Sequence, residues 1–572
     1  MAGCWMAGAR FHSAVIGGFA VWLTAVIVGQ EAGSPRPAPS HAVPSSAPHF
    51  ETSENCVACH NSLTTSSGED VSIGRAWRGS IMANSSRDPY WQASVRRETM
   101  DHPAHRQAIE DECATCHMPM ARTVAKSKGA HGNVFAHLPI GRNDSDTARL
   151  AADGVSCTLC HQIHADRLGT PESFSGGFVI APAPASGASI YGPFQVDTGR
   201  TRVMHSATGV RPAEGSHIQQ SELCATCHTQ YTRALGPGGE IVGSLPEQVP
   251  YLEWRHSAFR DERSCQSCHM PEVLEATPVA SVLGEPRPGL SRHTFVGGNV
   301  FMLRMLTRYR TELGVDALPA ELDANARATM KQLQSESATV TATASRPAAT
   351  TLALDVSVRN LTGHKFPTGY PSRRSWLHVT VRDQTGRAIF ESGEVQPSGA
   401  IAGNDNDVDA TSYEPHYEEI RTPDQVQIYE SVMVDRAGVV TTGLLSGTRF
   451  AKDNRLLPRG FEKSTAGGDI AVRGHAAADE DFNAEGDRVR YRIDIGRTVG
   501  PLEIDVVLRY QPISFRWAHN LESYAADEPR RFVTYFDAMS NESSFAVART
   551  TLHVPYPDRV AGTLAHPLAL TR

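Results

Sequence analysis

Cys224-Ala225-Thr226-Cys227-His228 is the stretch that decides the fold, because its pattern of two cysteines and a histidine occurs five times in the chain. The other copies are CVACH at 56–60, CATCH at 113–117, CTLCH at 157–161 and CQSCH at 265–269. Composition alone predicts about a hundredth of one such match in a chain of this length, so five copies are not accidental. Ten of the eleven cysteines belong to these motifs.

Cys-x-x-Cys-His is the attachment signature of c-type haem. Cysteines three apart on a helical turn point the same way, so both thiols can bond the two vinyl groups of one porphyrin, and the next histidine reaches the iron. The sequence therefore predicts five covalently bound haem c groups. The predicted thioether residues are Cys56, Cys59, Cys113, Cys116, Cys157, Cys160, Cys224, Cys227, Cys265 and Cys268, and the predicted proximal iron ligands are His60, His117, His161, His228 and His269.

Zinc and disulfides are the two competing interpretations of the paired cysteines. Zinc usually takes two Cys-x-x-Cys pairs for one metal ion. Five pairs do not divide into four-cysteine sites, and zinc needs no histidine after every pair. Disulfides within each pair, as in thioredoxin-like redox motifs, also leave the five histidines unexplained. Haem attachment accounts for every residue of the pattern.

An apolar run at 14–29, AVIGGFAVWLTAVIVG, follows Arg10 and His12, which is the order of the n- and h-regions of a secretory signal. The run is shorter than the roughly 20 residues that a membrane-spanning helix needs. No clean A-x-A cleavage site follows it, so residues 1–30 are either a cleaved signal peptide or an N-terminal anchor. Either alternative predicts a periplasmic or extracellular protein, secreted or membrane-anchored through this segment. Cys4 precedes the run and disappears with a cleaved signal.

Composition changes divide the rest of the chain. Residues 31–50 contain five prolines and several serines, and they are predicted to be a Pro/Ser-rich linker. The motifs fall within a predicted pentahaem domain at 51–299. This domain has too few residues for each haem to build an ordinary apolar core. The haems themselves are therefore expected to form the core, with short helices and long loops around them.

The C-terminal half has a different pattern. FMLRMLTRYRTEL and PAELDANARATMKQLQSES predict helices in a connector at 300–345, and the Thr/Ala-rich TVTATASRPAAT that follows predicts a linker. Alternating, β-branched stretches then predict antiparallel strands in a β-domain at 346–556, before a C-terminal tail at 557–572. The predicted fold is therefore multidomain, with a mainly α-helical and irregular multihaem domain followed by an all-β, sandwich-like domain. The strand stretches are TLALDVSVRN, SWLHVTVRD, RVRYRIDIG, LEIDVVLRYQ and ARTTLHV.

Each haem iron also has a sixth coordination position. A second histidine gives a low-potential electron carrier, methionine raises the potential, and an empty position permits small-molecule chemistry. The neighbouring residues favour four histidines near the motifs as distal ligands. Met82 is a rival candidate, although a buried methionine is more often a packing residue than a ligand. The four are His137, His205, His217 and His293. Other histidines of this region are His102, His105, His131, His164 and His256.

His364 stands outside the motif region, in NLTGHKFPTGYPSRRSW. Gly363, Pro367, Gly369 and Pro371 predict a rigid loop around it. One interpretation is an ordinary turn with a surface histidine. The other is that the β-domain inserts His364 as a fifth candidate distal ligand onto a haem at the domain interface.

The sequence around the motifs resembles that of the multihaem cytochrome c family related to tetrahaem cytochrome c-554 (cytochrome c-552/4-like), over about residues 50–300. The resemblance implies closely packed haems in stacked and perpendicular pairs. It does not imply catalysis, because the Cys-x-x-Cys-Lys motif of the related nitrite reductases is absent and hydroxylamine oxidoreductases have eight haems. The matching stretches are DECATCHMPM, DGVSCTLCHQI, SELCATCHTQYT, EWRHSAFRDERSCQSCHMP and SRHTFVGGN, and the GHKFPTGYP loop resembles one in C-terminal domains of some such cytochromes.

Two functional classes follow. The first is an electron carrier of an extracytoplasmic respiratory chain, with redox proteins as partners and docking on a membrane oxidoreductase complex through the β-domain. The second is a haem-dependent oxidoreductase that acts on a small nitrogen or sulfur compound at one open haem, for which no catalytic residue is assigned. Nucleic acid is excluded as a partner, because the chain has a net charge of −8 and no basic run or binding motif.

Overall fold

The computed structural model describes residues 48–184 and 186–556. The predicted signal peptide or anchor, nearly all of the predicted linker at 31–50, and the predicted tail at 557–572 lie outside the described residues. Within the described ranges, no helix is both long enough and apolar enough to cross a membrane.

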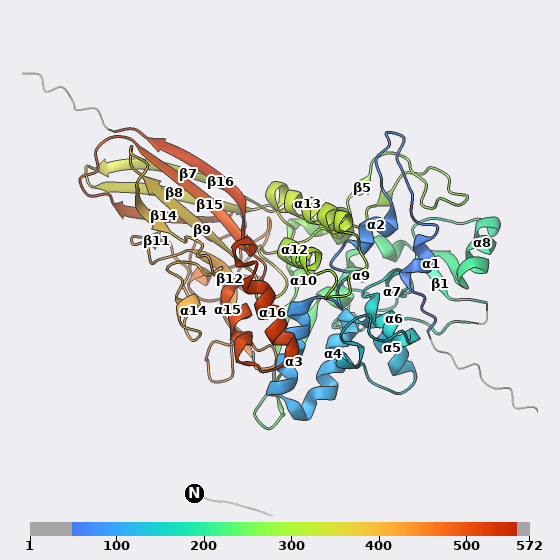
Figure 1. The fold of residues 1–572 in the computed structure, drawn as a ribbon. Coiled ribbons are helices and arrows are strands. Elements are labelled where there is room, and N and C mark those ends of the chain that lie inside the picture. The colour runs from blue at the N-terminus through green and yellow to red at the C-terminus, as the bar shows by residue number, and fades with distance from the viewer. Residues whose placement is uncertain (1–47, 185, 557–572) are drawn as a thin grey trace, which may run out of the picture. The chain divides into compact units, whose positions relative to one another are not determined.

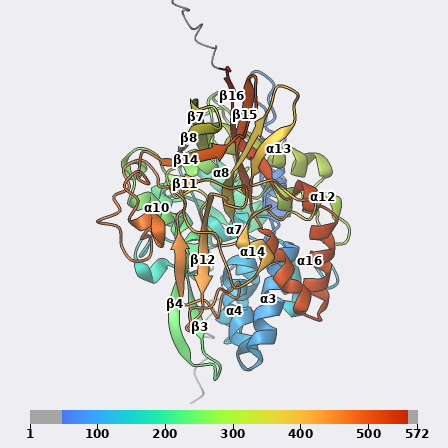
Figure 2. The same ribbon diagram turned by 90° about the vertical axis from the view of Figure 1, so that its left-hand side faces the viewer.

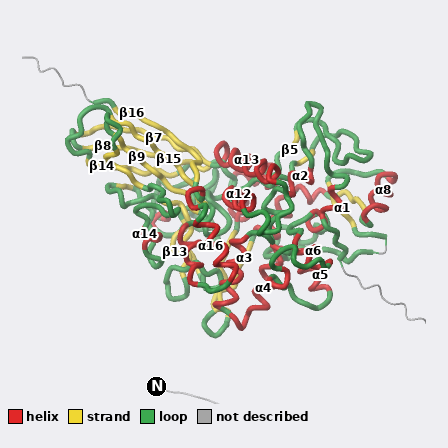
Figure 3. The backbone as a smooth tube through the Cα atoms, in the orientation of Figure 1, coloured by secondary structure: helices red, strands yellow, loops and turns green. Residues whose placement is uncertain are grey.

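The region of the motifs consists mainly of loops and short helices (Figure 3). Each motif begins in one helix. Four of these helices contain both cysteines of their motif, and in the first motif Cys59 follows in the turn after α1. The helices are α1 Ser53–Val57, α2 Ile73–Arg78, α3 Pro89–Asp101, α4 Arg106–His117, α5 Pro119–Ser127, α6 Asp146–Ala152, α7 Cys157–Cys160, α8 Thr198–Thr208, α9 Ser221–His228, α10 Pro250–Arg255 and α11 Cys265–His269. Two-stranded sheets join β1 Ser189–Gly192 with β2 Arg211–Glu214, β3 Gln230–Leu235 with β4 Ile241–Gln248, and β5 Glu272–Val273 with β6 Leu290–Ser291.

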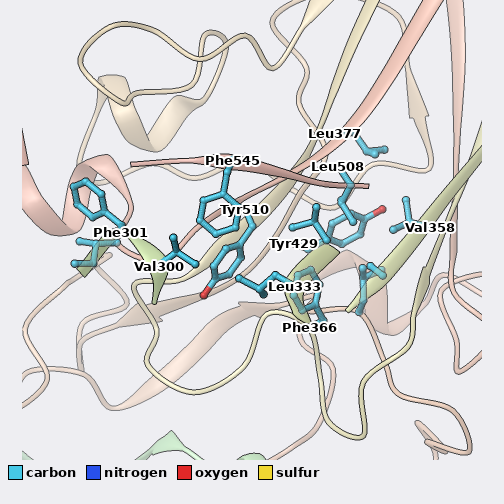
Figure 4. Packing of buried hydrophobic residues seen from close by; sticks show 14 of the residues in the cluster. Val300, Phe301, Leu333, Val358, Phe366, Leu377, Tyr429, Leu508, Tyr510 and Phe545 are labelled. Atoms are coloured by element: carbon cyan, nitrogen blue, oxygen red, sulfur yellow. The ribbon is translucent and has the colours of Figure 1, made fainter. Parts of the chain in front are cut away.

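Helices α12 (Val300–Arg308) and α13 (Pro319–Glu336) follow. Proline occupies the first turn of α13, where its missing N–H is not needed. Figure 4 shows Val300 and Phe301 of α12 close to Tyr510 and Phe545, with Leu333 of α13 nearby. All five side chains are buried in the largest apolar cluster of the described chain. The two helices therefore belong to the same core as the strands that follow them.

Two sheets make up most of the C-terminal region (Figure 1). One has the order β11-β14-β8-β7, and the other β13-β12-β9-β15-β16 with β10 also paired to β9. Apolar side chains of both sheets lie in one core, where the ring of Phe390 meets the edge of Tyr491. The strands are β7 Ala338–Ala348, β8 Thr351–Asn360, β9 Arg374–Arg382, β10 Ala388–Ser392, β11 Glu419–Ile420, β12 Ile428–Val434, β13 Arg449–Asp453, β14 Asp487–Asp494, β15 Leu502–Gln511 and β16 Phe545–Val554.

The motif region and the C-terminal region are joined by specific contacts. The hairpin of β3 and β4 (Figure 2) reaches the segment before β13, where the Leu235 N–H donates to the Leu445 carbonyl at 2.6 Å. Helix α3 packs along α16 (Asp527–Asp537), and Arg96 forms a two-pronged ion pair with Glu528 at 2.8 and 2.9 Å. These contacts join the C-terminal region to the motif region.

The structure corrects the boundary at 345. The Thr/Ala-rich stretch that was predicted as a linker is strand β7, which pairs with β8 along almost its whole length. Its alternation of threonine with valine or alanine is a strand pattern of period two, and Ala338 and Val340 are buried. The predicted connector at 300–345 therefore ends with α13.

The region predicted as an all-β domain also contains helices. These are the four-residue α14 (Asp405–Val408), α15 (Phe515–His519) and α16. Phe532, Tyr535 and Phe536 recur at helical spacing in α16 and are all buried, so the periodicity that identifies this helix is present in the sequence.

Candidate haem sites

One cavity of about 990 Å³ runs through the motif region, and its lining includes all ten motif cysteines and all five motif histidines. Its walls are mostly apolar, and every motif cysteine is a free thiol. A folded chain with a large apolar void lacks the packing partners that cores normally have. The five motifs therefore share one interior space of the kind that planar apolar cofactors fill.

Hydrogen bonds orient the motif histidines. In four of the five, Nδ1–H donates to a backbone carbonyl, which fixes the tautomer and leaves Nε2 free to bind a metal ion. Burial also lowers the pKa of His117 and of His228 to about 4, so both imidazoles are neutral at pH 7. The bonds are His60 to Val279 at 2.6 Å, His117 to Ser85 at 3.0 Å, His161 to Tyr191 at 2.6 Å and His269 to Val296 at 2.5 Å.

Two motif histidines each face a second histidine. The ring centroids of His161 and His293 are 6.4 Å apart with planes 16° from parallel. Those of His269 and His364 are 6.2 Å apart with planes 12° from parallel. Imidazole nitrogens lie about 2 Å from a bound metal ion, which puts the centroids of two opposed ligands about 6 Å apart. Both pairs therefore have the separation that one iron between them requires.

His293 and His364 share the hydrogen-bonding pattern of the motif histidines. Nδ1–H of His293 donates to the Ser291 carbonyl and that of His364 to the Lys365 carbonyl, each at 2.9 Å. Burial lowers the pKa of both rings to about 4, so they too are neutral ligands at pH 7. Together with the cavity and the free thiols, these pairs show that the residues present fit covalently bound haem c.

A buried group of charges holds the His364 loop. The side chain of Lys365 is fully buried, and its Nζ donates to Asp453 at 2.7 Å. Glu253 of α10 accepts the backbone N–H of Lys365 at 3.1 Å, and Arg455 bridges Glu253 at 2.9 Å and Asp453 at 2.8 Å. We call Glu253, Lys365, Asp453 and Arg455 the charge quartet. Because it joins α10 to β13 and the segment after it, it fixes the loop that places His364 opposite His269.

The other three predicted distal ligands lie elsewhere. In the described ranges, the cavity lining does not include His137, His205 or His217. Nε2–H of the buried His217 donates to the Ile163 carbonyl at 2.8 Å, which leaves only Nδ1 for other bonds. His205 lies on α8 against Gly187, and Nδ1 of His137 is buried without a partner in the described chain. Their assignment as distal ligands stays a prediction.

Some cavity residues carry no sequence signal. Trp91 of α3 stacks on the ring of His117, with centroids 4.4 Å apart and planes 6° from parallel. Glu247 of β4 is buried in the cavity wall, and burial raises its pKa to about 7. An isolated tryptophan or glutamate has no spacing that distinguishes it from a core or surface residue, so only the folded chain identifies these two.

Close thiols divide the five motifs into two groups. Three pairs of cysteines from different motifs lie close enough to shift each other's pKa, so the motifs that end at His60 and His161 are neighbours, and the motif that ends at His228 adjoins those that end at His117 and His269. The motif at His228 is therefore the middle one of its group of three. The cysteine pairs are Cys56 with Cys157, Cys116 with Cys227, and Cys224 with Cys265.

A separate cluster in the β-domain has the composition of a metal site. His416 Nε2 lies 3.1 Å from Asp479 and 3.8 Å from Asp487, and all three side chains are buried. However, Nδ1 of His416 accepts hydrogen bonds from the amides of Gln427 at 2.8 Å and Asn454 at 3.1 Å, whose own oxygens are occupied by backbone N–H groups. The proton must therefore sit on Nε2, where a metal ion would bind. The cluster is a hydrogen-bonded network.

Asp487→Asn is expected to stabilise the protein at neutral and alkaline pH. Burial raises the pKa of Asp487 to about 7, above its unfolded value of about 3.9. The protonated form therefore contributes stability that is complete below pH 4 and is lost as pH rises to 7. At about 1.4 kcal/mol for each pKa unit, the variant gains roughly 3 to 4 kcal/mol at pH 8 relative to pH 4. Urea unfolding of both proteins across this range measures the difference, and a pH-independent difference contradicts the prediction.

Five Cys-x-x-Cys-His motifs around one cavity define a covalent multihaem site. No family model matches the chain, and no curated protein matches it. Among solved structures, a penta-heme cytochrome c552 from Thermochromatium tepidum is similar at 16% sequence identity, with 88% of this chain and 98% of that chain covered and a TM-score of 0.47. The assignment of the haem sites rests on the motifs of this chain and their geometry.

Proposed function

We propose that this protein is a pentahaem c-type cytochrome that carries electrons in an extracytoplasmic respiratory chain. The observation that carries the proposal is the convergence of all fifteen motif residues on one cavity. Bound haem c supplies one-electron redox chemistry at each motif. The chain's own residues would supply covalent attachment through paired thiols, imidazole ligands, and a mostly apolar wall.

The closeness of the motifs supports electron transfer between them. Close thiols connect the motifs that end at His60 and His161, and connect the motif that ends at His228 to those that end at His117 and His269, so each attachment site adjoins another. Two of the motif histidines face a second histidine, and bis-histidine ligation is typical of low-potential electron carriers. Redox proteins outside the cytoplasm, including a membrane oxidoreductase complex, are the partners that we propose for such a carrier.

A haem count tests the proposal. The wild-type protein is expected to carry five haems in a pyridine haemochrome assay and five haem mass increments in denaturing mass spectrometry. Cys113→Ala with Cys116→Ala is expected to leave four, because both thioether bonds of one motif are lost. Thr115→Val in the same motif is the control and keeps five. A wild-type count other than five, or a double variant that retains five, contradicts the proposal.

Carbon monoxide distinguishes a carrier from an oxidoreductase with an open haem. A carrier whose irons all have two protein ligands shows no change in its reduced spectrum on exposure to the gas. A rapid shift of one haem in five favours the alternative, an enzyme that acts on a small nitrogen or sulfur compound.

A further inference from the structure

Two adjacent arginines, one directly before β9 and one at its first position, have opposite surroundings. Arg374 is buried, forms a two-pronged ion pair with Asp407 at 2.8 Å for both contacts, and donates to Gln511 at 2.8 Å. Arg373 is half-buried, and no carboxylate lies within 4 Å of its guanidinium in the described ranges. Its hydrogen bond there runs from Nη1 to the Thr368 carbonyl at 2.7 Å. Most donors of the Arg373 guanidinium are therefore free.

Arg373 lies where two motifs meet. It lines the cavity together with His228, His269 and His364. Burial is the largest cause of the lowered pKa of each of these histidines, and the charge of Arg373 contributes in the same direction to all three. The guanidinium is thus within electrostatic range of the motif that ends at His228 and of the His269–His364 pair.

The His364 loop leaves room for the guanidinium. Gly369 has a φ of +85°, which favours glycine, and a Cβ there would lie 3.0 Å from Nη1 of Arg373. A larger residue at this position would therefore be strained and would crowd the guanidinium. The same loop provides the Thr368 carbonyl that orients it.

A charge that is partly removed from water, as that of the half-buried Arg373 is, gains from a paired opposite charge. The fork of a guanidinium matches a carboxylate, which can accept two of its hydrogen bonds. Haem c carries two carboxylates, its propionates, and they are the anionic groups that the proposed function brings into this cavity. The pairing of Arg374 with Asp407 shows that this chain satisfies the neighbouring arginine with a carboxylate of its own.

We infer that Arg373 binds a haem propionate at the junction of the motifs that end at His228 and His269, and thereby raises the reduction potential of the haems there. The inference rests on the proposed function. A positive charge near an iron favours the reduced state, because reduction adds a negative charge. Without Arg373, the propionate is uncompensated and opposes reduction.

Potentiometric titration of the holoprotein tests the inference. Arg373→Gln is expected to lower the midpoint of one or two of the five haem transitions, with at least a tenfold loss in the ratio of reduced to oxidised haem at fixed potential, or about 59 mV for a one-electron couple. Arg373→Lys keeps the charge but not the fork, so a smaller shift in the same direction is expected. Arg346→Gln on β7 removes the same charge away from the cavity lining and is expected to shift no transition.

The outcomes separate the two proposals. If Arg373→Gln carries five haems and its midpoints equal those of Arg346→Gln, the inference is overturned while the proposed function stands. If Arg373→Gln does not accumulate, Arg373→Lys decides the question, and midpoints equal to wild type overturn the inference. A wild-type haem count other than five overturns the proposed function itself, whatever the midpoints.

Discussion

Replacing His364 with alanine is expected to convert one of the five haems from a six-coordinate to a five-coordinate state. The ring of His364 lies 6.2 Å from that of His269 and has its Nδ1–H committed to the Lys365 carbonyl, so its Nε2 is the free nitrogen opposite a motif histidine. Alanine removes this ligand and leaves the covalent attachment at Cys265 and Cys268 intact. The haem count is expected to stay at five.

Optical and EPR spectra measure the change. One fifth of the low-spin signal is expected to become high-spin, and one additional haem is expected to bind carbon monoxide. Added imidazole is expected to restore the low-spin signal, because it can occupy the space that the side chain leaves. His378→Ala is the control, since His378 of β9 bonds to Glu391 at 2.9 Å and does not line the cavity. Identical spectra for His364→Ala and His378→Ala would contradict the assignment of His364 as a distal ligand.

Asp453→Asn is expected to lower the free energy of unfolding strongly. Asp453 neutralises both cations of the charge quartet, with Lys365 at 2.7 Å and Arg455 at 2.8 Å. Although burial opposes it, the charges of Arg455 and Lys365 hold the pKa of Asp453 well below its usual range. Asparagine would leave the fully buried Lys365 without a counter-charge, which costs about 3–5 kcal/mol.

Chemical unfolding of the holoprotein at pH 7 measures this cost. Asp505→Asn is the control, because Asp505 on β15 pairs with the exposed Arg549, and such surface pairs contribute only about 0–1 kcal/mol. Because the pKa of Asp453 is depressed, its contribution is complete above pH 4 and lost as pH falls below that value, so the two variants should converge in strongly acidic solution. Equal losses for Asp453→Asn and Asp505→Asn at pH 7 would show that the quartet contributes no stability.

Several parts of the fold could be predicted from sequence pattern. The stretches TLALDVSVRN and LEIDVVLRYQ coincide with β8 and β15, because period-two alternation is a local property of a strand with one buried face. The same pattern was present in β7, but its small side chains resemble a linker. Helix α16 lies between two strands, β15 and β16, whose alternating pattern predicts strands only.

The attachment of haem is determined by chain-local chemistry. Two thiols and an imidazole within five residues are brought to one turn by any helical conformation, so the pentapeptides specify their cofactor wherever they lie in the fold. The distal ligands, in contrast, are not determined by a local stretch of sequence. Whether His293 or His364 faces an iron depends on segments that are distant in the chain and meet only after folding.

The surroundings of Arg373 and Arg374 give the clearest contrast. The two residues are identical and adjacent, yet one is paired with Asp407 and the other projects its free donors into the cavity. Arg373 ends the loop that carries His364, whereas Arg374 is the first residue of β9, so the two positions meet different environments, and residue type alone does not reveal which. The motifs specify what the protein binds, and the packing of the C-terminal strands through the charge quartet decides which side chains complete the sites, because ligand geometry and buried charge pairing depend on distances that only the packed chain sets.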